Sequence, residues 1–416
     1  MHCSRIGEVQ VRCALRVHFC SMLAVWISIV MSQAAGTSRN PAAAPMSMLM
    51  HRHGEWSLML HAQAFLANSN ASGFRGRQKT FSTNWFMITA ARPLGGGTLA
   101  LRSMLSLEPA TISNRSYPEL FQTGETAFGR QLIDAQHPHD LFMELAAEYL
   151  WKIRNTNVYV YAAPAGDPAF GPVAFPHRAS AAELPQAPLT HHVLDSTHIS
   201  FNVITAGAIR GPATIEASAF HGHEPDENRW NIDGGRIDSW ASRVRLQPTA
   251  NLDLQVSTAH LTHPEAVEPG YQNRTSASIS YTRGTWSTTA AWGRVYKEVH
   301  DRNIDGLLGE SVVRILQRHY LTARFESVDK DELFPHPILT VVPRPPQPVR
   351  VFRVKAYTIG YTVDVIRGAY GQIGIGANAT RYQYPAILNG FYGENPHTVM
   401  VFLRGRLGAP MAMEME

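Results

Sequence analysis

Residues 98–108 read TLALRSMLSLE, and this stretch decides the fold class. Its odd-numbered positions are mostly leucine, whereas its even-numbered positions include Arg102 and Glu108. Successive side chains of an extended strand point to opposite faces, so this alternation predicts a strand with one apolar and one polar face. The pattern recurs at residues 351–357 and 399–406. Strands of about ten residues exceed the ~5–6 residues usual in soluble sheets, which favours an all-β, membrane-spanning barrel.

The connections between these strands alternate between short turns and long loops. The short turns are predicted at residues 92–96, 154–156, 210–212, 248–251, 283–285, 317–319 and 367–368. The long loops are predicted near residues 68–79, 109–139, 164–196, 221–236, 262–272, 299–309, 329–349 and 385–396. Seven turns on the side that holds both termini and eight loops on the other predict one sixteen-stranded antiparallel barrel of the Gram-negative outer-membrane type. Fourteen strands is the alternative, because the break at Gln317 is assigned partly to keep the strand number even.

The composition agrees with this class. The chain of 416 residues has 44% hydrophobic and only 17% charged residues, whereas soluble domains carry about 25% charge. Beyond the N-terminal region no stretch approaches ~18 consecutive apolar residues, and a closed barrel is the other structure that a bilayer permits. The formal net charge of +4 is too small to indicate a nucleic-acid partner.

The first 35 residues are predicted to be a signal peptide. Basic residues precede an apolar run at residues 22–31, and small residues follow it, so cleavage is expected after Ala34 or Ala35. An N-terminal anchor helix is the alternative. All the cysteines lie in this segment, so the mature chain needs no disulfide. The predicted organisation is a signal peptide at 1–35, a Met/His-containing segment at 36–54, the barrel at 55–407 and a tail at 408–416.

If the apolar parity of each strand faces lipid, the polar parity lines the lumen. The predicted pore-lining residues are Arg102, Glu108, Glu144, Glu148, Glu216, Arg243, Arg245, Arg314, Arg324, Glu326, Arg353, Lys355, Arg404 and Arg406. The acids lie mostly on early strands and the bases on late ones, so they face each other across a closed barrel. This predicts a water-filled pore with a slight anion preference, or alternatively ion pairs that fill the interior.

The predicted loop at 164–196 is the third on its side and contains six prolines. A second proline-rich loop is predicted at 329–349. Proline at this density stiffens a loop that has no core of its own. Long loops without secondary structure are usually functional or disordered. The loop at 164–196 is therefore expected to fold inward and narrow the pore, with a surface cap as the alternative.

Histidines concentrate in the long loops. Two His-x-His patterns lie beside acidic residues, and neutral imidazoles with nearby carboxylates suit Zn²⁺ or Cu²⁺. The predicted metal ligands at the extracellular mouth are His137, His139, Asp140, His191, His192, His198, His221, His223 and Glu224. The alternative is that these histidines only hydrogen-bond the loop backbone.

A second stretch near the N-terminus is also rich in methionine and histidine. It includes Met46, Met48, Met59 and His61. Thioether and imidazole together suit copper. The alternative is a flexible tail that leads into the first strand.

An enzyme would need a reactive constellation. Asp195, Ser196 and His198, with Asp140 and His139, offer an arrangement for a hydrolase at the barrel mouth. The chain contains no nucleophile elbow, phosphate loop or zincin motif. We therefore predict no catalytic residue and no obligatory cofactor, with an outer-membrane hydrolase as the weakest alternative.

Five segments resemble a family of mostly uncharacterised bacterial outer-membrane β-barrel proteins. They are QLIDAQHPHDLFME at 131–144, GPVAFPHR at 171–178, HHVLDSTHIS at 191–200, EPDENRW at 224–230 and KDELF at 330–334. The resemblance covers residues 55–407 and implies an outer-membrane barrel. The family offers no established activity to carry over, although its members are associated with heavy-metal or copper resistance settings.

The resemblance also implies contact with outer-membrane lipid and with the barrel-assembly machinery, which typically reads a terminal aromatic residue. Here nine residues follow Leu407, so an internal signal around Phe402 is expected instead. A homo-oligomer is left open. The sequence thus predicts a porin-like channel for small polar solutes or ions whose loops bind a transition metal. The alternative is a closed metal-binding protein of copper or zinc resistance.

Overall fold

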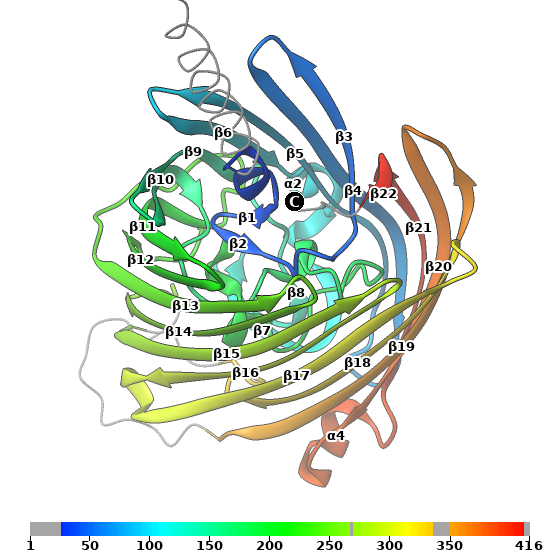
Figure 1. Cartoon of the computed structure of the whole chain (residues 1–416). Helices are drawn as coiled ribbons and strands as arrows, with labels where there is room; N and C mark the ends of the chain where they lie inside the picture. The colour runs from blue at the N-terminus through cyan, green and yellow to red at the C-terminus, as the bar shows by residue number, and fades with distance from the viewer. Residues whose placement is uncertain (1–25, 267–268, 336–349, 412–416) are drawn as a thin grey trace, which may run out of the picture.

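The computed structural model describes residues 26–266, 269–335 and 350–411. Sixteen long antiparallel strands form a closed barrel, which confirms the predicted fold class (Figure 1). The strands are β4 (Trp56–Ala71), β5 (Gln78–Leu94), β6 (Gly97–Leu105), β9 (Phe142–Ile153), β10 (Thr156–Gly166), β11 (Ser200–Arg210), β12 (Ala213–His221), β13 (Ser239–Thr249), β14 (Leu252–Thr262), β15 (Tyr271–Arg283), β16 (Trp286–Lys297), β17 (Arg302–Ile315), β18 (His319–Lys330), β19 (Phe352–Arg367), β20 (Gly371–Gln383) and β21 (His397–Leu407).

Each predicted short turn joins two neighbouring strands of the barrel. At the break near Gln317, Ile315 pairs with His319, so the alternative of fourteen strands is wrong. The predicted long loop at 299–309 is also wrong, because β17 already begins at Arg302. Its residues continue the in-and-out alternation of a strand and pair with β16.

Two shorter strands lie beside the closure of the barrel. β21 pairs with β4 from Thr398↔Ala71 to Arg406↔Gln63. Beyond that point β3 (Met46–His53) pairs with β4, and β22 (Ala409–Met411) pairs with β3. Parts of the predicted N-terminal segment and C-terminal tail are therefore strands.

The outer face of the barrel is apolar. Ile359, halfway along β19, is 70% exposed, and its neighbours on the same strand alternate between exposed and buried positions. Leu101 and Val401 are likewise exposed, whereas Arg102 and Phe402 are buried. The apolar face therefore contacts lipid, as expected for a protein that crosses the membrane with strands. None of the helices among the described residues is long and apolar enough to span a membrane.

We expect Ile359→Lys to destabilise the folded barrel by about 2–4 kcal/mol, because a lysine at mid-strand on the lipid face must enter the hydrocarbon core. Leu316→Lys is the matched control, because Leu316 is 80% exposed in the turn between β17 and β18. Near the interface the same change costs ~0–1 kcal/mol. Urea unfolding in lipid vesicles, followed by tryptophan fluorescence, measures both. Equal losses would contradict the assignment of the lipid face.

Segments that connect or precede the long strands fill much of the interior of the barrel. Figure 1 shows β1 (Gln33–Ala35), β2 (Ser38–Arg39), β7 (Tyr117–Ala127) and β8 (Arg130–Gln136) inside the ring of long strands. Short helices accompany them: α2 (Glu108–Thr111), η1 (Ser113–Arg115), η2 (Phe175–His177), α3 (His191–Leu194) and η3 (Ser196–His198). The remaining short helices are η4 (Glu298–His300), η5 (Ala386–Leu388) and α4 (Asn389–Tyr392), and Tyr392 of α4 packs against Phe121 of β7.

The described part of the predicted signal peptide also packs inside. Residues 26–31 are helical, and Trp26, Ile29, Val30 and Met31 pack against wall residues such as Met87. The three cysteines, and residues 336–349 of the second proline-rich loop, lie outside the described residues.

Candidate functional site

The inner wall carries paired charges instead of separate acidic and basic halves. Arg243 Nε donates to Glu216 Oε2 at 2.8 Å, and Arg102 Nη1 donates to Glu144 Oε1 at 3.0 Å. Both pairs join neighbouring or nearby strands and are almost fully buried. The geometry is that of the ion-pair alternative, in which charges fill the interior and neutralise each other locally.

Most of the predicted pore-lining residues point inward. The buried members are Arg102, Glu108, Glu144, Glu148, Glu216, Arg243, Arg245, Arg324, Glu326 and Arg404. Arg314 and Arg406 line a cavity in the lumen. Glu108 belongs to α2 rather than to the wall.

The assignments of Arg353 and Lys355 to the lumen are wrong. Arg353 lies on the outward parity of β19, with a side chain 42% exposed, and its Nε donates to Asp329 at 2.7 Å. Lys355 shares that parity. The inward positions are the apolar Phe352 and Val354, which pack against chain inside the barrel. The rule that apolar residues face lipid fails here because the lumen contains an apolar core of its own.

The segment between β10 and β11 lies in the lumen, not over it as a cap. Arg178 links this segment to the wall. Its Nε donates to Glu310 Oε1 on β17 at 2.5 Å, and its Nη1 donates to Asp195 Oδ2 within the same segment at 2.9 Å. Further along, Arg404 pairs with Glu183, and Thr190 donates to Glu326 on β18 at 3.0 Å. Contacts to charged groups on β17, β18 and β21 therefore fix this segment inside the barrel.

Five histidines, which we call the five-histidine cluster, lie together here. His191, His192 and His198 are on the segment between β10 and β11, and His137 and His139 follow β8. Ligand atoms of His137, His191 and His192 lie within 4.8 Å of one another. The rings of His191 and His198 have centroids 5.2 Å apart, and His198 lies 5.2 Å from His139. The cluster is buried or nearly so. Five of the predicted metal ligands, His137, His139, His191, His192 and His198, therefore lie together in one largely buried cluster.

Hydrogen bonds at Nδ1 orient these rings. His191 Nδ1 lies 2.7 Å from Asp195 Oδ1, and His198 Nδ1 lies 2.7 Å from the Asp195 carbonyl oxygen. His139 Nδ1 lies 3.0 Å from Glu108 Oε2. An acceptor at Nδ1 places the proton there and leaves Nε2 as the free lone pair, which is the arrangement of histidines that bind metals.

The pKa values agree with neutral imidazoles at the centre of the cluster. Burial, with the neighbouring histidines, holds the pKa of His192 and of His198 well below the ordinary value. Burial also lowers the pKa of His137, whereas for His139 the Glu108 carboxylate outweighs burial and raises it. Neutral imidazole is the form that binds a metal.

Carboxylates surround the cluster. Glu125 Oε1 lies 2.7 Å from His137 Nε2, and Glu125 also pairs with Arg229. Burial raises the pKa of Asp140 to about 7 and that of Glu224 to about 7. One oxygen of each of these two carboxylates has no hydrogen-bond partner, and neither does Nε2 of His192 or His198. Buried polar atoms without partners are rare and need an explanation, and a bound cation would supply one.

The second His-x-His pattern lies elsewhere. His221 Nδ1 lies 2.9 Å from the Arg236 carbonyl oxygen, and the rings of His221 and His223 stack with centroids 6.1 Å apart. Within the described ranges no contact joins this pair to the five-histidine cluster. Glu224 does adjoin the cluster, because its Oε1 accepts from Ser196 at 3.5 Å. Sequence analysis found no signal for Glu125, which lies against His137, or for Phe175, whose ring contacts His139 and His191.

The hydrolase constellation is not assembled. Ser196 Oγ accepts from Arg274 Nη1 at 2.6 Å. In the part of the chain that the structure describes, no hydrogen bond joins Ser196 to His198, whose Nδ1 faces the Asp195 carbonyl oxygen. Ser196 Oγ instead lies 3.5 Å from Glu224 Oε1, so the serine–histidine pair expected for such a site is not formed.

A closed sixteen-stranded barrel with an apolar outer face and an inward-folded third long loop defines a porin-like protein of the bacterial outer membrane. Neither a family model nor a curated protein matches the chain.

Solved structures share the architecture. An anion-selective porin from Comamonas acidovorans superposes with a TM-score of 0.55 at 9% identity, over 85% of this chain and 100% of that one. OmpF of Salmonella typhi, in complex with daunomycin, gives 0.52 at 8% identity, over 86% and 100%. OmpT of Vibrio cholerae gives 0.51 at 6% identity, over 86% and 100%. At these identities the likeness concerns the fold.

Proposed function

We propose that this protein is a porin-like channel for small polar solutes or ions whose constriction binds a transition metal ion, Zn²⁺ or Cu²⁺. The main support for a metal site is that ligand atoms of His137, His191 and His192 lie within 4.8 Å of one another on segments inside the lumen. Sixteen strands enclose enough space for an aqueous channel when the lumen is not filled by other chain. A metal at this point would lie on the path of any solute.

The residues present suit such an ion. His191, backed by Asp195, matches the carboxylate–histidine pair that fixes a ligand ring. His192 and His198 offer unpartnered Nε2 atoms, and Glu224 and Asp140 offer unpartnered oxygens. Imidazoles with carboxylates nearby favour Zn²⁺ or Cu²⁺ over Ca²⁺ or Mg²⁺, which prefer oxygen ligands alone.

The second candidate is a closed metal-binding protein, which the filled lumen favours. A cavity that remains between the inward segment and the wall holds only about 110 Å³. Residues 26–35 occupy part of the lumen, and we propose that signal-peptide cleavage removes them and widens it. We further propose that the barrel-assembly machinery inserts the chain, and we leave a homo-oligomer as an open possibility. We propose no catalytic activity.

Zinc binding tests the metal site. We expect His191→Gln/His192→Gln to weaken Zn²⁺ binding by at least ~10–100-fold, because even changes behind the ligands of a metal site cost that much. His221→Gln/His223→Gln is the matched control and should bind as the parent does. Equilibrium dialysis of the refolded protein in detergent measures both. Equal binding by parent and test variant would overturn the metal site.

Single-channel recording tests the channel. We expect conductance steps from the refolded mature chain in a planar bilayer, and we expect Zn²⁺ to suppress them in the parent but not in His191→Gln/His192→Gln. A folded barrel that binds Zn²⁺ and never conducts would favour the closed metal-binding protein instead.

A further inference from the structure

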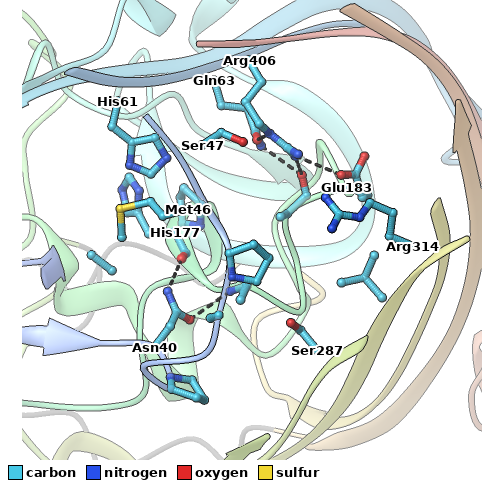
Figure 2. Close-up of a pocket in the computed structure, with 18 of the residues that line it drawn as sticks. Asn40, Met46, Ser47, His61, Gln63, His177, Glu183, Ser287, Arg314 and Arg406 are labelled. Carbon is cyan, nitrogen blue, oxygen red and sulfur yellow. Dashed lines mark hydrogen bonds and ion pairs between the residues drawn. The ribbon is translucent and has the colours of Figure 1, made fainter. Parts of the chain in front are cut away.

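The cavity of about 110 Å³ lies inside the barrel near the short turns. In the full chain its walls come from Ser32 and Ala34, from residues 40–47, from β4 and β5, from the inward segment at 176–183 and from β16 to β18. Figure 2 shows His61, His177 and Met46 together on one side of this cavity, with Arg314 and Arg406 on the other side. The five-histidine cluster does not line it.

The two histidines of this cavity are held by packing and not by hydrogen bonds. Both rings contact Trp85 edge-on, with centroids 4.5 Å away for His61 and 4.4 Å for His177. His177 is only 8% exposed. Both of its ring nitrogens, and Nδ1 of His61, have no hydrogen-bond partner.

Packing alone does not account for these nitrogens. Leaving a buried polar group without a hydrogen bond is destabilising, and His177 leaves both of its ring nitrogens in that state. A side chain that served only to pack against Trp85 would be better as phenylalanine or leucine. Burial, together with the nearby His61, His198 and His139, also holds the pKa of His177 well below its ordinary value, so the ring is neutral and its lone pair is free.

The other donors nearby are soft. Met46 lines the cavity beside the two histidines. On the adjoining wall His61 pairs with Met87, and Met87 pairs with Met104, so methionines continue around the inner face from β4 to β6. The carboxylate that lines the cavity, Glu183, is already held by Arg404 and Arg406. The other lining oxygens, such as those of Asn40, Ser47 and Ser287, are neutral, so the described lining offers no free carboxylate to a hard cation such as Mg²⁺ or Ca²⁺.

We propose that Met46, His61 and His177 form a second metal site that binds a soft monovalent cation, Cu⁺ or Ag⁺. Thioether sulfur selects such ions, whereas the five-histidine cluster has no thioether and suits divalent ions. The site is separate from the one proposed for Zn²⁺ and does not depend on it.

Silver binding tests this site. The refolded full chain in detergent, with its cysteines alkylated because thiolates bind Ag⁺, is dialysed against Ag⁺ after saturation with Zn²⁺, and bound silver is measured by mass spectrometry. We expect Met46→Leu and His177→Gln each to lose one equivalent of Ag⁺ while Zn²⁺ binding is unchanged. Met50→Leu and His53→Gln are matched controls, because both residues are exposed on β3 and leave the cavity intact.

Three results would overturn the proposal. The first is that the parent binds no more Ag⁺ than Met46→Leu and His177→Gln do. The second is that Met50→Leu loses as much silver as Met46→Leu. The third is that His177→Gln loses silver while Met46→Leu keeps it, which would show a site without a thioether ligand. Met46→Leu conserves volume, and heat-modifiable migration on gels verifies that every variant is a folded barrel.

Discussion

Replacing residues 173–194 with a short Gly-Ser linker should raise single-channel conductance severalfold. This segment lies in the lumen and is fixed to the wall by Arg178 with Glu310 on β17 and by Arg404 on β21 with Glu183. A sixteen-stranded barrel without it would hold a wider water-filled channel. The wall charges that lose their partners would then be hydrated, so the barrel should still fold.

A loop deletion of different location provides the control. Deleting residues 231–236, which are largely exposed between β12 and β13, should leave conductance near that of the parent. Planar-bilayer recordings of the three proteins decide the question. If the 173–194 replacement folds and its conductance matches the parent, the inward segment is not the constriction.

The second large effect concerns stability. Arg178→Met should lower the free energy of unfolding by about 3–5 kcal/mol, because it leaves the buried carboxylates of Glu310 and Asp195 without their shared partner. Arg294→Met is the matched control. Arg294 pairs with Asp305 at 2.8 Å on the outside of the barrel, with a side chain 47% exposed.

Exposed ion pairs contribute only ~0–1 kcal/mol, so the control should unfold almost as the parent does. Urea unfolding in lipid vesicles, monitored by tryptophan fluorescence, compares the variants. Adding Glu310→Gln to Arg178→Met should recover part of the loss, because it removes the charge of one of the two buried carboxylates that Arg178 no longer neutralises. Losses of equal size for Arg178→Met and Arg294→Met would refute burial as the cause.

Much of the barrel was predictable because it depends on local geometry. Alternation at 98–108 and 399–406 predicted the inward and outward residues of β6 and β21 correctly. The same rule was wrong at Arg353 and Lys355. Alternation in a sequence shows that the two faces of a strand differ in polarity. Which face contacts lipid also depends on the segments that fill the lumen, and those segments are distant in sequence.

The metal clusters were less predictable. Sequence analysis named His137, His191 and His192, but it placed them at the mouth and grouped them with His221 and His223, which lie apart. The pairing of His61 and His177 at the cavity was not predicted. Nothing in the sequence around either histidine indicates that both rings contact Trp85 edge-on.

The sequence by itself determined the strands, the seven short turns and the membrane environment, because a two-residue period and turn residues act over a few neighbouring positions. Only the tertiary structure decided that the chain between β10 and β11 folds inward, and which histidines meet there. Those contacts join residues such as His137 and His191, or Arg178 and Glu310, that are far apart along the chain. These residues come together because buried charges and rings inside a closed barrel must be paired with groups from other segments.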